Sequence, residues 1–426
     1  MQQALNGIYD LNNLTIFLHK CLSRYPERGD LMKRIAAFIK REMILCIAGL
    51  LAVISLFFVP PDRQYLQYVD YQVLALLFCL MTVMEGFKCT GLFEKMAMAL
   101  LCRVHTFRQL YLVLVLLCFF SSMWITNDVA LLTFVPFALL VLKVAGLQRE
   151  VIPVILMQTI AANLGSMATP VGNPQNLYLY SSAGMELGEF IRILGPLTIV
   201  SLLLILAACL CHRSYPLQQE TLKCMMEERK GAGQNQTGVS GHNRKMLWEN
   251  LVLTALFICC LLSVLRILSW QWMLGGTVIV CILLSVFGKE KFLPRKVDYY
   301  LLLTFVAFFI FIGNMGRIPA VRAWISRILD GRELLVSFGC SQVLSNVPAA
   351  ILLEGFTDRY DLLLRGVNIG GMGTLIASMA SLISYKLFAA ESDREPAVGT
   401  KGNYILKFTG YSAVMAAVLL LAAQFI

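Results

Sequence analysis

The residue best suited to chemistry is Asp128, which stands in the phrase ITNDVA (125–130) between two apolar stretches, 109–123 and 129–145. An ionisable side chain at membrane depth costs about 2.5–3.5 kcal/mol on insertion scales, and such residues usually mark ion or proton pathways. Asp128 could therefore coordinate Na⁺ or carry a proton. The alternative is that it caps the helix beginning at Val129, since Asp is favoured at that position. One carboxylate can do both.

A second polar phrase, LSNVPAA (344–350), resembles the first in residue types. Thr126 and Ser345 supply hydroxyls, while Asn127 and Asn346 supply amide oxygens, the kind of ligand that hard cations prefer. Ordinary hydrogen bonding between membrane helices is the alternative for such residues. Their recurrence at both places favours a cation- or proton-coupling site. Its candidate residues are Thr126, Asn127, Asp128, Ser345 and Asn346. Beyond a possible Na⁺ the sequence indicates no metal and no cofactor.

A longer phrase is written twice in the chain. Residues 163–177 read NLGSMATPVGNPQNL and residues 368–382 read NIGGMGTLIASMASL, without a gap between the copies. Both lie in apolar surroundings but are rich in Gly, Asn, Ser and Thr. Unwound backbone survives within a bilayer only where it is buried in protein or lines a cavity. Two interruptions at matching places in two halves indicate the binding site of a transporter.

The two interrupted stretches suit an anionic substrate. The N-terminus of a half-helix exposes N–H groups and the positive end of its dipole. Glycine lets backbone approach closely, and Pro170 and Pro174 enforce the unwinding. Plain glycine-mediated helix packing is the alternative, and two amides beside two breakers in GNPQN (172–176) argue against it. The candidate substrate-binding residues are Asn163, Gly165, Thr169, Gly172, Asn173, Asn176, Asn368, Gly370, Thr374, Ser378 and Ser381.

Composition places these residues in a polytopic membrane protein. The chain has 426 residues, of which 58% are hydrophobic and 15% charged, and its mean hydropathy is +0.71. Soluble domains are about 45–50% apolar and about 25% charged. The net charge of +10 gathers at membrane ends, so a nucleic-acid partner is not expected. The 13 cysteines lie mostly in apolar runs, as packing residues do, and no cleavable signal is evident.

The elements that must position the candidate residues follow from the apolar runs. Crossings are expected at 43–59, 69–84, 190–211, 251–268, 270–287, 299–312 and 404–426. Residues 109–145 and 334–353 each contain two apolar segments separated by a short polar tip. Their lengths and periodicity fit two short membrane spans as well as one re-entrant hairpin. Residues 91–102 and 318–329 look like interfacial amphipathic helices.

This order predicts an all-α polytopic membrane protein with two inverted-topology repeats, each holding a re-entrant helical hairpin and a broken transmembrane helix. We expect an N-terminal segment at 1–42, a first helix and first repeat at 43–211, a flexible linker at 212–249 and a second repeat at 250–426.

Basic residues predict the orientation. The first 42 residues are rich in Lys and Arg, so the positive-inside rule places the N-terminus and the linker in the cytoplasm. Lys88 falls on the cytoplasmic side by the same count. Four arginines run against the rule, because Arg317, Arg322, Arg327 and Arg332 would lie outside.

The phrases ITNDVA, NLGSMATPVGNPQNLYLY (163–180), LSNVPAA and NIGGMGTLIAS (368–378) resemble the ion transporter superfamily, from about Met43 to the C-terminus. That group includes citrate transporters, arsenite-efflux permeases, NhaD-type sodium/proton antiporters and divalent anion/sodium symporters. The wording is most similar to bacterial anion permeases. The resemblance implies a scaffold domain, a mobile transport domain, an elevator-like motion, a homodimer and the bacterial inner membrane. Where the symporters have Ser-Asn-Thr at both tips, this chain has Thr-Asn-Asp and Ser-Asn-Val, which puts a sodium-coupled dicarboxylate importer in doubt.

The sequence therefore predicts a secondary active transporter for a small anion, a carboxylate or oxyanion, coupled to Na⁺ or H⁺. A Na⁺/H⁺ antiporter without an organic substrate is the alternative, and a channel is a third reading. An enzyme is not expected, because no HExxH, P-loop, GxSxG or GxGD motif occurs in the apolar segments.

Overall fold

Every regular element of the described chain is a helix. The computed structural model describes residue 38 and residues 42–101, 104–217, 239–287 and 297–425. Among them, eight helices are long and apolar enough to cross a membrane. The prediction of an all-α polytopic membrane protein is confirmed.

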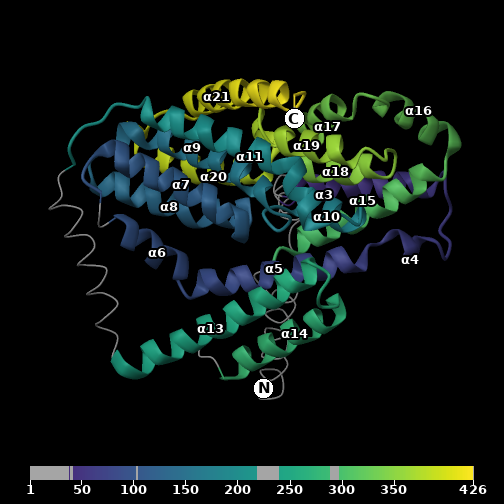
Figure 1. The fold of residues 1–426 in the computed structure, drawn as a ribbon, viewed down its shortest axis with the longest axis horizontal. Coiled ribbons are helices and arrows are strands. Elements are labelled where there is room, and N and C mark those ends of the chain that lie inside the picture. The colour runs from purple at the N-terminus through teal and green to yellow at the C-terminus, as the bar shows by residue number, and fades with distance from the viewer. Residues whose placement is uncertain (1–37, 39–41, 102–103, 218–238, 288–296, 426) are drawn as a thin grey trace, which may run out of the picture.

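One set of helices, here called the scaffold group, packs mainly among its own members. Within this group, α13 and α14 lie below α5 in Figure 1, and α3 and α15 lie above it, at the level of α10 and α18. Its members are α3 (Met43–Leu56), α5 (Tyr71–Cys89), α13 (Val239–Val264), α14 (Trp270–Phe287) and α15 (Tyr299–Gly316). The short α4 (Tyr65–Tyr68) precedes α5 and contacts α15.

The remaining long helices form the core group, in the upper half of Figure 1. Two helical hairpins belong to it, α7 (Phe107–Ile125) with α8 (Asn127–Val144), and α17 (Glu333–Leu344) with α18 (Asn346–Glu354). Two interrupted helices lie beside them, α9 (Val151–Gly165) with α10 (Pro174–Ser182), and α19 (Tyr360–Gly370) with α20 (Met379–Arg394). The helices α11 (Leu187–Leu210) and α21 (Lys401–Ala422) complete the group.

Burial orders the core group around α9. The segment Gln148–Ala168 is 89% buried, whereas the spans Leu247–Val264 and Pro396–Ala422 are each 28% buried. A helix that is apolar around its whole circumference belongs inside a bundle. The first interrupted helix is therefore the centre of the core, whereas α13, α15 and α21, whose spans are 28%, 33% and 28% buried, present most of their surface outward.

The expected amphipathic pieces are helical, as α6 (Leu92–Leu101) and α16 (Pro319–Leu329). The second half differs from expectation at its start, because α13 begins at Val239, inside the stretch predicted to be a flexible linker. A helix can continue beyond the apolar run that crosses the membrane, since its hydrogen bonds are internal. The predicted N-terminal segment and residues 218–238 of the predicted linker lie outside the described residues, residue 38 and Glu42 excepted.

Candidate functional site

A single residue turns the chain at each hairpin tip, in a backbone conformation that side chains rarely adopt. Thr126 has φ 65° and ψ 149°, and Ser345 has φ 78° and ψ 155°. A non-glycine residue there costs about 1–3 kcal/mol and persists only when its surroundings enforce it, which is a property of functional sites. The two tips thus have the same backbone conformation.

Each tip is held by an interrupted helix through equivalent contacts. The hydroxyl of Thr169 donates to the carbonyl of Met123, and the hydroxyl of Thr374 donates to the carbonyl of Gln342 at 3.3 Å. Met123 and Gln342 both stand three residues before their tips. In both halves, a threonine of the duplicated phrase therefore holds the hairpin by a hydrogen bond.

All three predicted glycines are needed for close approach, and at Gly172 a Cβ would collide with the backbone carbonyl of Ser166. A Cβ on Gly165 would collide with the backbone carbonyl of Phe119 and the hydroxyl of Ser122. At the equivalent place, a Cβ on Gly370 would collide with the side chain of Ser341. For Gly165 and Gly370 the packing role is therefore direct, because the hairpin lies against the helix end.

The first interruption is a stretch of extended and 3₁₀ backbone that ends at a capped helix. Thr169 and Asn173 are extended, and the Asn173 side chain accepts a hydrogen bond from the backbone N–H of Asn176 at 2.9 Å. Pro174 occupies the first position of α10. Asn at the cap followed by Pro is the expected start of a helix, since proline has no N–H to leave unpaired.

The second interruption depends on a residue of the facing hairpin. Gln342 donates from Nε2 to the carbonyls of Gly370 and Met372, at 2.9 and 2.8 Å, and accepts from the N–H of Thr374 at 3.0 Å. One amide thereby satisfies three backbone groups that the unwound helix leaves without a helical partner. Sequence reasoning did not select Gln342.

The two interruptions meet through Asn163. Its Oδ1 accepts from Asn127 Nδ2 at 3.1 Å and from Ser378 Oγ at 3.0 Å, and its Nδ2 donates to Ser381 Oγ at 2.9 Å. All four side chains are buried. The first hairpin tip, the first interrupted helix and the second interrupted helix are therefore joined at one amide.

A second set of amides joins the same two helices. Asn173 Nδ2 donates to Asn368 Oδ1 at 3.2 Å, and Asn368 Nδ2 donates to Asn176 Oδ1 at 2.7 Å. We call the connected residues the amide ladder. It consists of Asn127, Asn163, Asn173, Asn176, Asn368, Ser378 and Ser381. Most residues predicted to bind substrate thus bind one another in this conformation.

We expect Asn163→Leu to lower the thermal stability of the purified protein. Leucine would leave the buried polar groups of Asn127, Ser378 and Ser381 without this partner, and each unpaired buried group costs about 1–3 kcal/mol. A melting curve in detergent measures the effect. Asn403→Leu is the matched control, because Asn403 is exposed on α21. Equal melting temperatures for the two variants would contradict the structural role of the ladder.

A cavity of about 610 Å³ lies between the two helix groups, bounded by α5, the start of α15, the first tip and the first interruption. Of the predicted residues, Thr126, Asp128 and Asn173 line it. Asp128 is partly buried there, and its backbone N–H donates to Asn127 Oδ1 at 3.0 Å. Ser345 and Asn346 at the second tip do not line this cavity.

Three charged residues of the cavity wall were not predicted as site residues. Glu85 and Lys88 come from the last turns of α5, and Asp298 precedes α15. Asp298 interacts electrostatically with Asp128 and caps α15 by accepting from the N–H of Leu301 at 3.1 Å. The phrase Val-Asp-Tyr occurs at 69–71 and again at 297–299, and Asp70 caps α5 in the same way. That repetition was the available signal for Asp298.

The acidic residues that line the cavity do not form a metal-binding cluster. No group of three or more His, Cys, Asp or Glu among the described residues is placed to hold a metal ion. Three carboxyls face the cavity with one ammonium, so the wall carries an excess of two negative charges when all four are ionised. Glu85 pairs with Lys88 at 3.2 Å, Asp298 is exposed and Asp128 is partly buried.

The fold and the cavity define a polytopic membrane transporter. Its helices interrupted at membrane depth, the charged cavity between two helix groups and the paired strained tips are features of that class. The family comparison agrees, because residues 31–355 match the model of the family described as "Citrate transporter". The chain belongs to this family.

Similar proteins occur in bacteria, archaea and animals. The "Inner membrane protein YbiR" of Escherichia coli (strain K12) is 31% identical over 78% of this chain and 84% of its own. The "Uncharacterized transporter MJ0456" of Methanocaldococcus jannaschii is 30% identical over 75% of this chain and 81% of its own. The "P protein" of Homo sapiens is 26% identical over 34% of this chain and 18% of its own.

Proposed function

We propose that this protein is a secondary active transporter that moves a small anion, a carboxylate or an oxyanion, together with Na⁺ or H⁺. The observation that carries the proposal is the position of Asp128. Its carboxyl borders the cavity one residue after an amide of the ladder and two residues after a strained tip. A carboxyl in that position can bind a cation or a proton where a solute enters.

Helix α10 supports an anionic substrate. Asn173 and Pro174, at its N-terminus, line the same cavity as Asp128. The N-terminus of a helix carries about half a positive charge, which favours an anion. Anion and coupling cation would then bind within one cavity.

The charge of the wall supports coupling. An anion entering a cavity with an excess of two negative charges meets repulsion unless protons or Na⁺ enter too. The binding of one species then raises the affinity for the other, and this coupling is reciprocal. Symport follows from that reciprocity, with the coupling set Thr126, Asn127 and Asp128 on the cavity side and Ser345 and Asn346 at the second tip.

The division into two helix groups supports an elevator-like motion. The ladder and the tip contacts tie both hairpins to the interrupted helices, so the core group is suited to move as one body against the scaffold group. The inverted orientation of the two halves, a cytoplasmic N-terminus, a homodimer and an inner-membrane location complete the proposal. The similarity to an inner membrane protein of Escherichia coli supports the location.

A Na⁺/H⁺ antiporter is the second candidate, and the acidic excess of the cavity favours it. In that case the carboxyls would bind Na⁺ and H⁺ alternately and no organic anion would move. A channel would conduct without coupling.

Proteoliposomes containing the purified protein distinguish these functions. Uptake and efflux of a panel of carboxylates, arsenite, phosphate and sulfate would be measured under separate Na⁺ and H⁺ gradients, with a pH-sensitive dye inside. The proposal predicts saturable flux of one anion class, driven uphill by one of the two gradients. Na⁺-driven proton movement without anion flux would instead establish the antiporter, and flux independent of either gradient would establish a channel.

A further inference from the structure

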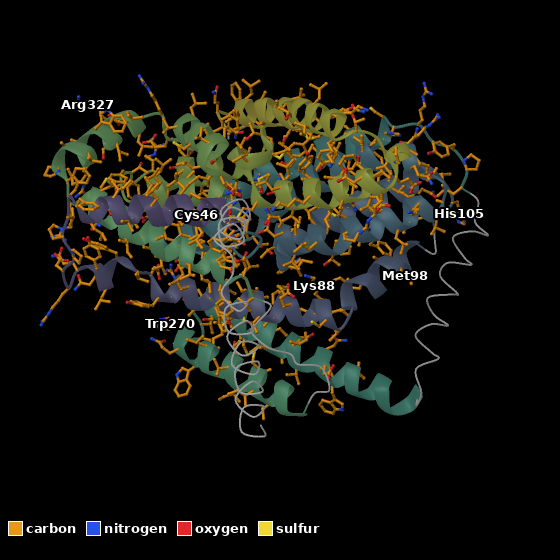
Figure 2. The ribbon with its side chains drawn as sticks, turned by 180° about the vertical axis from the view of Figure 1, so that it is seen from behind. Cys46, Lys88, Met98, His105, Trp270 and Arg327 are labelled. Atoms are coloured by element: carbon orange, nitrogen blue, oxygen red, sulfur yellow. The ribbon has the colours of Figure 1, made fainter. Side chains whose placement is uncertain are left out.

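Lys88, on α5 of the scaffold group, places a positive charge in the wall of the cavity between the two helix groups. It lies in the last turn of α5, below the core group in Figure 2. Among the described residues that line the cavity it is the only basic one. Asp128 and Asn173, from the core group, border the same space. An anion in this cavity therefore has one ammonium available to it.

Lys88 has a partner that it can exchange. Its Nζ lies 3.2 Å from Glu85 Oε1, and the Lys88 side chain is 37% exposed. A pair at this helical spacing contributes little to stability, whereas a hydrogen bond to a charged group is several times stronger. The flexible four-carbon stem of lysine allows the ammonium to move between partners.

We propose that Lys88 selects the transported solute by its charge. Its ammonium group breaks the ion pair with Glu85 and binds the transported anion instead. This inference rests on the proposed function, because it requires that an anion enters the cavity. It assigns one wall of the anion site to the scaffold group. The substrate class is a small anion whose carboxylate or oxyanion oxygens accept from an ammonium.

The acids around Lys88 set the conditions for this exchange. Glu85 competes with the anion for the ammonium, and Asp128 and Asp298 repel the anion while they are ionised. Protonation of these carboxyls, or a cation bound beside them, removes the repulsion. Because Lys88 and Asp298 belong to the scaffold side and Asp128 to the core group, the complete site exists only while both groups face the cavity. Anion affinity then differs between the end states, and the anion stabilises the state that binds it better.

The test compares transport kinetics of Lys88→Gln, Lys88→Arg and Glu85→Gln in proteoliposomes, with the anion that the wild-type protein moves. Lys88→Gln should raise KM about ten- to a hundredfold, the range expected for loss of a hydrogen bond to a charged group. Lys88→Arg should keep KM near the wild-type value, and Glu85→Gln should lower it by releasing the ammonium. The dependence on the driving cation should stay measurable in all three.

Lys143→Gln is the matched control, since Lys143 pairs with Glu391 and Glu395 at 3.4 and 3.1 Å, away from the cavity. Melting curves of all variants identify any that fail to fold. If Lys88→Gln does not fold, the KM values of Lys88→Arg and Glu85→Gln still test the proposal. An unchanged KM in Lys88→Gln, with anion flux intact, would overturn the role of Lys88 alone. Wild-type protein that moves no anion would overturn both the inference and the proposed function.

Discussion

Replacing Asp128 by Asn should abolish coupled transport while the protein stays folded. The amide keeps the size of the side chain but cannot be deprotonated and binds Na⁺ without net charge. The loss in stability should be small, because Asp128 contacts the tip through its backbone N–H, which the substitution keeps. A negative charge in the first turn of a helix contributes about 0.3–1 kcal/mol. Flux under imposed Na⁺ and H⁺ gradients, beside a melting curve, measures both effects.

Asp62→Asn is the matched control for this experiment. Asp62 pairs with Arg317 at 2.7 Å, outside the cavity, and its side chain is 39% exposed. Exposed pairs of this kind contribute about 0–1 kcal/mol, so transport and stability should stay close to wild type. Wild-type coupling in the Asp128→Asn protein would remove Asp128 from the mechanism.

The second large effect is expected from Gly165→Ala, which should prevent correct folding. The added methyl group would collide with the carbonyl of Phe119, and backbone cannot rotate away as a side chain can. Overpacking costs typically about 1–3 kcal/mol and occasionally more, and here it would also force the first hairpin from the end of α9. The yield of monodisperse protein in size-exclusion chromatography, with its melting temperature, measures the loss.

Gly410→Ala is the control for this experiment, and it should change the stability in the opposite direction. A Cβ at Gly410, on α21, would meet no atom within 4 Å, and Ala in a helix interior is about 0.5–1 kcal/mol more favourable than Gly. Stability should therefore rise slightly. Normal yield and melting temperature for Gly165→Ala would show that the hairpin does not rest on the helix end as closely as described.

The local parts of the site could be predicted from the sequence because their signals are local. Gly172, Asn173 and Pro174 stand together and break a helix by their own backbone preferences. The hairpin tips were visible as polar phrases between apolar arms. The strained backbone of Thr126 and Ser345 was not, because nothing in residue type demands a positive φ there.

The long-range parts could not be predicted. Asn163 pairs with Ser378 and Ser381, and no periodicity says which of many buried polar groups will meet. Lys88 was interpreted as a topological marker, since a lysine at the end of an apolar run ordinarily is one. Only the packing of α5 against α10 shows that it lines the same cavity as Asp128. The early start of α13 was hidden because a helix outside the membrane needs no apolar run.

The amide ladder has a consequence for biogenesis. Asn163 and Asn173 leave the ribosome well before Ser378, Ser381 and Asn368, their partners in the later half. Until those partners are synthesised, the side-chain amides of the early half need other hydrogen-bond partners, such as water, lipid headgroups or a chaperone. A chain that stops before Asn368 therefore lacks the ladder partners of both early amides.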